Sequence, residues 1–273
     1  MNFPGSSPMF DLSAALTAYL LFLTAVLGLV FGSFGNAWAW RIVNGESVAK
    51  GRSHCATCGH PLSAADLVPL ASFLFLRGRC RYCGEKISPR YPLAETLCAL
   101  VFVSLALRFG FTPETLRLCI LGFLLFVLSL VDLDSCVIPN RFPLLAAANF
   151  AAFALFGAQP GKTLLHGLIG GLSLFVPMLA LVMLADRVLG RESMGGGDLK
   201  LLFVLGLYTG AARGLMLLIL ACCIGLVFAL LPGVRGKDAE NPRAFPFGPS
   251  LALAAWPVLL FGDAFLTWYL GLF

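Results

Sequence analysis

Charged side chains are scarce in this chain: Asp, Glu, Lys and Arg make up 12% of its 273 residues, whereas 59% of the residues are hydrophobic. A soluble domain averages about 25% charged residues, so the composition excludes an ordinary soluble domain. The hydrophobic runs are continuous and do not alternate with polar residues, which favours helices over a transmembrane barrel. We therefore expect an all-α polytopic membrane protein embedded in membrane lipid.

Histidine is also scarce, with only His54, His60 and His166, and no Ser/His/Asp or Cys/His set suggests nucleophilic catalysis. The net charge of +5 does not indicate a nucleic-acid partner, because the basic residues concentrate in a few loops. No basic segment precedes the first apolar run, since residues 1–11 contain no Lys or Arg. We expect that run to be a retained membrane span and not a cleaved signal.

The apolar runs predict about eight transmembrane helices. One of them, at 199–210, is short for a full crossing, which takes about 20 residues. By composition the chain divides into a first span (1–35), a polar cysteine-containing domain (36–92) and a multi-span membrane domain (93–273). The eight runs are 12–34, 93–109, 115–131, 142–157, 164–185, 199–210, 213–232 and 247–270.

The distribution of basic residues predicts the orientation of these spans. If residues 36–92 lie in the cytoplasm and the spans alternate, 15 of the 19 basic residues are cytoplasmic, as the positive-inside rule requires. The same alternation places Asp132 and Asp198 together at the cytoplasmic boundary. The 15 residues are Arg41, Lys50, Arg52, Arg77, Arg79, Arg81, Lys86, Arg90, Arg141, Arg187, Arg191, Lys200, Arg235, Lys237 and Arg243.

Two CxxCG knuckles, Cys55–Gly59 and Cys80–Gly84, lie in the 36–92 segment. Two cysteine pairs at this spacing supply four thiolates for a tetrahedral Zn²⁺, and the glycine after each pair permits a tight turn. The alternatives are two disulfides or free thiols, and a cytoplasmic location argues against disulfides. We predict a structural zinc site formed by Cys55, Cys58, Cys80 and Cys83, which folds a loop too short to build its own core.

Acidic residues at membrane depth are costly and are candidates for function. Two carboxylates held together in an apolar site can act as general acid and general base on a water molecule. Asp198 follows Gly195, Gly196 and Gly197, which leave the approach to it open, and either Asp132 or Asp134 is its partner by position. Taken singly, Asp198 also suits a helix N-cap and Asp132 the interfacial end of a helix. The other acids of this kind are Glu95 and Asp263.

Two other classes of protein remain alternatives at this point. A polytopic transporter would use these acids as a proton or cation relay, and its sequence would show an internal repeat or paired broken helices. No repeat is visible, and a tetracysteine loop has no obvious place in such a protein. A structural assembly factor would leave the Gly-Gly-Gly-Asp stretch unexplained.

Taken together, these motifs resemble those of the type IV prepilin peptidases, the prepilin leader peptidase/N-methyltransferase family of GxGD intramembrane-type aspartic proteases. The likeness runs almost from end to end, and the tetracysteine loop combined with GxGD makes it specific. The segments that carry it are Gly32–Asn36 with Arg41, Arg52–His60, Gly78–Gly84, Arg90–Pro92 with Glu95, Asp132–Asp134 with Ile138-Pro139, Gly195–Asp198 with Lys200, and Pro246–Pro249.

The resemblance implies that Asp132 and Asp198 are the catalytic acids and that residues 93–273 form the aspartic peptidase domain. It further implies cleavage of the short basic leader of type IV prepilins or type II secretion pseudopilins, after a glycine at the cytoplasmic face of the bacterial inner membrane. N-methylation of the new N-terminus with S-adenosylmethionine is implied in the same way, without an assignment of the residues that bind this cofactor. Secondary site candidates are Asp134, Glu95, Gly195, Gly197 and Lys200.

Two positions depart from the family pattern. Many members carry a large residue where this chain has Gly196, and many carry Asp where this chain has Asn140. Neither position is one of the two acids, and both bear on how a substrate is held.

Overall fold

The computed structural model describes residues 13–48, 51–230 and 245–272. Four basic residues used above to orient the chain (Lys50, Arg235, Lys237 and Arg243) and the last two residues of the 213–232 run lie outside them. The chain forms two compact units, Met1–Phe123 and Leu124–Phe273. The elements in order are α1 (Ala14–Val43), the 3₁₀ helix η2 (Ala64–Leu67), α2 (Ala71–Phe75), α3 (Arg90–Phe109), α4 (Pro113–Ser135), α5 (Arg141–Leu155), α6 (Pro160–Leu189), α7 (Gly196–Leu230) and α8 (Gly248–Leu270).

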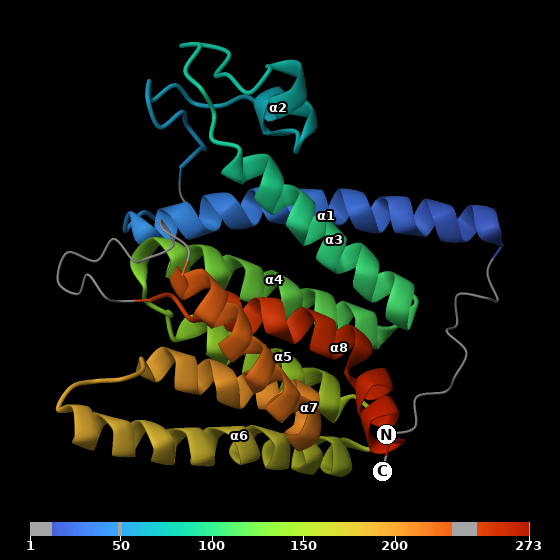
Figure 1. Ribbon diagram of the computed structural model, residues 1–273. Coiled ribbons are helices and arrows are strands. Elements are labelled where there is room, and N and C mark those ends of the chain that lie inside the picture. The colour runs from blue at the N-terminus through green and yellow to red at the C-terminus, as the bar shows by residue number, and fades with distance from the viewer. Residues whose placement is uncertain (1–12, 49–50, 231–244, 273) are drawn as a thin grey trace. The chain divides into compact units, whose positions relative to one another are not determined.

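The first unit is built on close packing of α1 against α3, which cross each other in Figure 1. A Cβ atom added to Gly32 of α1 would lie 2.7 Å from the Cα atom of Glu95 in α3, so only glycine fits at this contact. Small residues allow such close backbone approach between membrane helices. This contact fixes the beginning of α3 against α1. The polar segment between the two helices ends just before this point.

In the second unit, α7 packs against both α6 and α8. Gly170 of α6 and Gly206 of α7 face each other so closely that a Cβ atom on Gly206 would lie 2.6 Å from the carbonyl oxygen of Gly170. Figure 1 shows α6 and α7 running side by side. These glycines let the backbones of α6 and α7 come into contact. The contact fixes the position of α7 along α6, and therefore the position of the first residues of α7.

The predicted all-α membrane fold is confirmed. Six of the described helices are long and apolar enough to cross a membrane, namely α1, α3, α4, α6, α7 and α8, and α5 is a shorter apolar helix. The predicted run 199–210 and the described part of the run 213–232 both lie in α7, in which two helical segments meet at a kink with non-helical backbone at Gly210. The eight predicted runs therefore correspond to seven of the described helices, because α7 contains two helical segments that meet at Gly210. The division of the chain at residues 35 and 92 stays a prediction.

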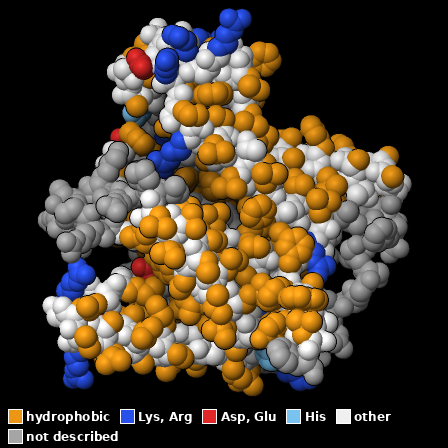
Figure 2. All heavy atoms as spheres, viewed as in Figure 1, with side chains coloured by type: hydrophobic (Ala, Val, Ile, Leu, Met, Phe, Trp, Pro, Cys, Tyr) orange, Lys and Arg blue, Asp and Glu red, His pale blue; other side chains and the backbone are white. Residues whose placement is uncertain are grey.

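The outer surface of the helices suits lipid. Large apolar side chains are exposed along α1, including Tyr19, Phe22 and Leu27, and Figure 2 shows hydrophobic side chains over most of the visible helical surface. Lys and Arg side chains gather over the segment around α2 in the same view. A helix surface of this composition is stable in hydrocarbon, where its backbone groups bond internally.

Candidate active site and metal centre

Asp132 lies in the last turn of α4 and is only 3% exposed. Its Oδ2 atom accepts a hydrogen bond of 2.8 Å from the backbone N–H of Gly248, the first residue of α8. The N-terminus of a helix offers unpaired N–H groups and a positive dipole end to an acid. The start of α8 therefore holds the Asp132 carboxylate in a fixed orientation.

Asp198 lies in the first turn of α7, where its own N–H donates to the carbonyl oxygen of Gly195 at 3.1 Å. Its Oδ1 atom is buried and has no hydrogen-bond partner among the described residues. Two helices, α5 and α6, separate α4 from α7, so the end of α4 and the start of α7 share one end of the unit, as the alternation of spans predicts.

The three glycines before Asp198 have different surroundings. A Cβ atom on Gly195 would lie 3.2 Å from Oδ2 of Asp198, and one on Gly197 would lie 2.7 Å from Cβ of Ile138. A Cβ atom on Gly196 would meet nothing within 4 Å. Gly197 thus allows α7 to begin directly against the segment that follows α4, whereas Gly196 leaves open space beside Asp198.

The structure distinguishes Asp134 from Asp132. Asp134 is exposed, while Asp132 two residues earlier is buried, as expected for residues 200° apart on a helix. Lys200 extends from the first turn of α7 and donates a 2.8 Å hydrogen bond to Oδ1 of Asn140. The second departure from the family pattern, Asn140, therefore partners the lysine of the motif that contains Asp198.

Glu95 and Asp263 have other partners. Glu95 is 7% exposed in α3, in the first unit, and its Oε2 atom accepts a 2.8 Å hydrogen bond from the N–H of Leu70 just before α2. Asp263 of α8 forms an ion pair of 3.1 Å with Arg213 of α7. The structure thus gives each of these two acids contacts of its own.

The two cysteine knuckles have the same backbone geometry. The N–H of Gly59 donates to the carbonyl oxygen of Cys55 at 2.8 Å, and that of Gly84 donates to Cys80 at 3.0 Å. Both glycines have positive φ angles, 69° and 72°, a region that favours glycine. The predicted role of the glycine after each CxxC pair is therefore visible in both turns.

The four knuckle sulfurs, from Cys55, Cys58, Cys80 and Cys83, lie within 4.8 Å of one another and form no disulfide. The sulfurs of Cys55 and Cys83 are 3.9 Å apart, and a tetrahedral ion with Zn–S bonds of about 2.3 Å requires a separation of about 3.8 Å. Backbone hydrogen bonds from Cys58 and Thr57 lower the pKa of the Cys55 thiol to about 6, which favours the thiolate that a metal needs. The donor set fits a tetrahedral thiolate-bound metal.

Sequence reasoning missed the contact between Gly248 and Asp132. The sequence did contain a signal for this contact, the segment Pro246–Pro249. This segment is part of the family resemblance, but the resemblance assigned it no role. A backbone donor is hard to find from sequence, because every residue except proline has an N–H group. The N–H group of Gly248 differs from most others because its residue has no side chain. A Cβ atom on Gly248 would lie 2.8 Å from Oδ2 of Asp132.

Two family models match this chain. Residues 26–109 match the model described as the Bacterial Peptidase A24 N-terminal domain. This range of the chain includes all four knuckle cysteines. Residues 119–230 match the model described as the Type IV leader peptidase family. This range of the chain includes Asp132 and Asp198. No solved structure gives a significant match.

Several curated proteins are similar over most of their length. A prepilin leader peptidase/N-methyltransferase of Aeromonas salmonicida is 36% identical over 221 residues, covering 81% of this chain and 75% of that protein. Proteins of the same name from Pseudomonas putida and Bacillus subtilis are 35% and 31% identical, covering 90% and 92% of this chain and 92% and 98% of theirs. With both family models and these relatives in agreement, this chain belongs to the type IV leader peptidase family.

Proposed function

We propose that this protein is a membrane aspartic endopeptidase that removes the basic leader of type IV prepilins and type II secretion pseudopilins. The observation that carries the proposal is the position of two acids, the buried Asp132 and the half-buried Asp198, at the adjoining ends of α4 and α7 in a chain of this family. Cleavage after a glycine at the cytoplasmic face of the bacterial inner membrane is part of the proposal. It is supported by the basic residues of the polar loops and the names of the relatives.

In this mechanism the two carboxylates share one proton and hold a water molecule against the scissile carbonyl. The ionised carboxylate takes a proton from the water as it attacks, and the protonated one gives its proton to the product amine. The Gly248 N–H holds one oxygen of Asp132, so its other oxygen is available to the water. The open space at Gly196 gives an extended substrate backbone room beside Asp198.

The same protein is proposed to N-methylate the new N-terminal residue, because its relatives carry that activity in their names. S-adenosylmethionine, the implied cofactor, would supply the methyl group from its sulfonium centre. Zn²⁺ is the proposed metal of Cys55, Cys58, Cys80 and Cys83, and its role is structural. All four coordination positions are filled by protein thiolates, which leaves none for a reacting water.

Substitution of each acid by asparagine tests the peptidase. Purified membranes containing the wild type, Asp132→Asn or Asp198→Asn are incubated with a prepilin that has a Gly-Phe junction, and the N-terminus of the product is identified by mass. We expect either variant to lose leader removal by at least about 10³-fold, because each acid is needed for proton transfer.

Two further substitutions control for the chemical change. Asp134→Asn alters an exposed acid two residues from Asp132, and Asp263→Asn alters a membrane acid paired with Arg213. Both are expected to retain cleavage. Full processing by Asp132→Asn or Asp198→Asn, at wild-type abundance in the membrane, would overturn the proposal.

A further inference from the structure

The segment that contains α2 is apolar, although it lies in the predominantly polar stretch between α1 and α3. Residues 67–76 include no charged side chain, and Ser72 is the only one of them with a polar side chain. Arg77, Arg79 and Arg81 follow directly. Leucine and phenylalanine side chains bordered by basic residues are typical of elements that lie in the interface of a membrane.

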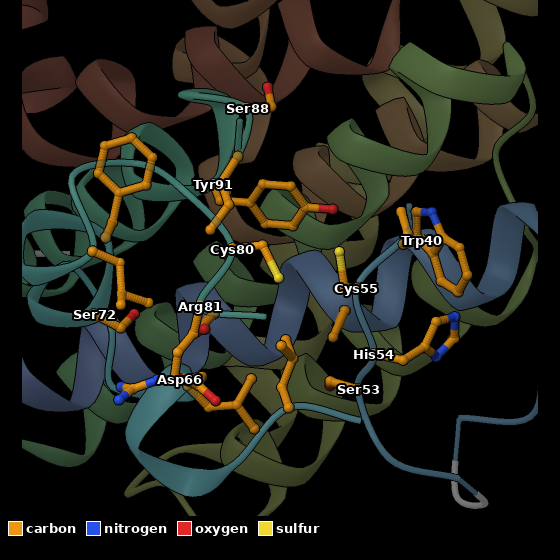
Figure 3. A pocket seen from close by; sticks show the side chains of 18 of the residues that line it. Trp40, Ser53, His54, Cys55, Asp66, Ser72, Cys80, Arg81, Ser88 and Tyr91 are labelled. Atoms are coloured by element: carbon orange, nitrogen blue, oxygen red, sulfur yellow. The ribbon is translucent and has the colours of Figure 1, made fainter. Parts of the chain in front are cut away.

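The two sides of α2 have different surroundings. Ser72 and Phe73 line a cavity of about 420 Å³ between α1, the beginning of α3 and the tetracysteine loop, and Figure 3 shows Ser72 among the side chains around it. Leu74 and Phe75 are instead 71% and 87% exposed, and Val68, just before α2, is exposed as well. None of these three side chains lines the cavity. We call Val68, Leu74 and Phe75 the apolar tip.

A buried acid of α3 sets the position of this segment along the membrane helices. Oε2 of Glu95 accepts a 2.8 Å hydrogen bond from the backbone N–H of Leu70, the residue before α2. Glu95 itself packs against Gly32 of α1. The beginning of α2 is therefore close to the level of Gly32, and Figure 1 shows α2 beside the length of α1 and not beyond its C-terminal end.

Gly32 belongs to the part of α1 that faces lipid. Trp38 and Trp40 lie near the C-terminal end of α1, and tryptophan is enriched at the interfaces of a membrane. With a rise of 1.5 Å per residue, Gly32 lies about 9–12 Å nearer to the middle of the helix than these two residues. Val30 and Phe34, on either side of Gly32, are exposed apolar side chains. The apolar tip is thus level with an apolar surface of α1 that suits hydrocarbon.

The turn before α2 has a strained backbone. Leu70 has φ 56° and ψ −49°, and the N–H of Ala71 donates to the carbonyl oxygen of Pro69 across it. These are the features of the rare γ-turn with positive φ, and such strain persists only where the surrounding structure fixes it. The hydrogen bond to Glu95 provides this support. The fold therefore specifies the position of the apolar tip.

Two arginines without an acidic partner follow the apolar tip. Arg77 and Arg79 are exposed, and no carboxylate of the described residues pairs with them. The acid that precedes α2, Asp66, is paired with Arg81 at 2.7 Å, and Figure 3 shows these two side chains close together. A guanidinium group binds phosphate through parallel hydrogen bonds. Arg77 and Arg79 are therefore available to phosphate groups next to the apolar tip.

We propose that the apolar tip inserts into the membrane surface beside α1 and that Arg77 and Arg79 bind the phosphate groups of anionic phospholipids there. Hydrocarbon removes the exposed tip from water, and arginine side chains at the edge of an apolar layer extend to the headgroups. Because α2 and the tetracysteine loop line the same cavity, this contact also holds the loop against the membrane. The inference does not depend on the proposed peptidase or methyltransferase activity.

A protein segment is the other kind of partner that could cover the apolar tip. The basic leader of a prepilin is disfavoured, because it would meet the like charge of Arg77 and Arg79. A second copy of the chain is disfavoured for the same reason, since a two-fold interface brings the same arginines from both sides. Three side chains are also too few for the area of about 800 Å² per partner that a stable protein interface buries.

Crosslinking from the apolar tip tests the proposal. p-Benzoylphenylalanine replaces Phe75 in the full-length, metal-loaded protein, which is placed in nanodiscs of equal amounts of phosphatidylcholine and phosphatidylglycerol and irradiated. Mass spectrometry of the peptide that contains position 75 identifies the molecule joined to it. We expect lipid adducts, with phosphatidylglycerol at least about twofold more frequent than phosphatidylcholine, because basic residues attract anionic lipid.

Three further samples serve as controls. Arg77→Gln combined with Arg79→Gln should keep the lipid adducts at position 75 but make the two lipids equally frequent. The same label in place of Phe22, exposed on α1, should join both lipids equally. In place of Glu46, which is exposed beyond the end of α1, it should give few lipid adducts. Equal abundance and zinc content of labelled and unlabelled protein show that the labelled chains fold.

The other results would overturn the proposal. If position 22 joins lipid and position 75 does not, the apolar tip lies outside the membrane. Adducts of position 75 with a second copy of the chain, or with an added prepilin, in place of lipid would make the tip a protein-binding surface. Equal yields of the two lipids from position 75 with both arginines present would show that Arg77 and Arg79 do not bind anionic lipid.

Discussion

The backbone N–H of Gly248 donates a 2.8 Å hydrogen bond to Oδ2 of Asp132, across 116 residues of sequence. This contact joins the end of α4 to the beginning of α8. It needs a glycine, because a Cβ atom at position 248 would lie 2.8 Å from the same oxygen and 3.1 Å from a methyl carbon of Leu128. Gly248 is thus a positioning residue for the acid that we propose to be catalytic.

Gly248→Ala is predicted to reduce leader cleavage about a hundredfold. The added methyl group pushes the Asp132 carboxylate aside, and a misplacement of about 1 Å in a reacting group costs about this much. Steady-state kinetics with a prepilin substrate should show the loss mainly in kcat, because the change affects the acid and not the surface that binds substrate.

Gly161→Ala is the matched control for this substitution. It adds the same methyl group to α6, where nothing lies within 4 Å, and we expect kcat within about threefold of the wild-type value. Equal activity of Gly248→Ala and Gly161→Ala would show that the contact between Gly248 and Asp132 does not position the acid.

Removal of the metal is predicted to unfold the tetracysteine loop. Structural zinc sites of this kind contribute the folding energy of the segment that they hold. Chelation, or Cys58→Ser, should speed tryptic cleavage of the backbone after Arg77, Arg79 and Lys86 and reduce the zinc content from one ion per chain. Cys223→Ser alters an exposed cysteine of α7 outside the cluster and should do neither. A loop that resists trypsin equally with and without metal contradicts the structural role.

Asp66 is predicted to stabilise the loop uniformly across the neutral range. The Ser63 hydroxyl and Arg81 lower the pKa of its carboxyl from 3.8 to about 2. A carboxyl with a lowered pKa in the folded state contributes stability above its unfolded pKa and loses it as the pH falls toward about 2. Asp66→Asn should therefore speed tryptic cleavage of the loop by the same factor at every pH between 5 and 8. A factor that shrinks between pH 8 and pH 5 would show that the carboxyl titrates in that range.

Much of this arrangement could be predicted from the sequence because it depends on local pattern. Continuous apolar runs predict membrane helices, and a CxxCG pair fixes its own turn through neighbouring backbone groups. The even number of helices between Asp132 and Asp198 allows the two acids to lie at the same end of the helices. Such features require only the order of residues and the thickness of a membrane.

Other features depend on contacts between distant segments and left little trace in the sequence. The donor to Asp132 is a backbone N–H group, and the cavity beside Glu95 is lined by residues from α1, α3 and the loop between them. The boundary between the runs 199–210 and 213–232 was expected, and two helical segments do meet at Gly210, but apolar composition does not show that a single glycine joins them in place of a loop. The approach of α1 to α3 likewise depends on which glycine faces which backbone.

The break in α7 leads to a last prediction, on stability. Gly210 has φ 73° and ψ −179°, a combination that essentially only glycine adopts. An added Cβ atom there would meet nothing within 4 Å, so Gly210→Ala tests backbone strain alone, which costs about 1–3 kcal/mol.

Gly161→Ala in α6 is the control for this substitution. A Cβ atom on Gly161 would also meet nothing within 4 Å, and Gly161 has no positive φ. We expect Gly210→Ala to lower the free energy of unfolding in mixed micelles by about 1–3 kcal/mol and Gly161→Ala to leave it unchanged or slightly raised. Since the two substitutions add the same atoms to open space, equal stability of the two variants would mean that α7 tolerates a regular helical residue at position 210 and has no required break there.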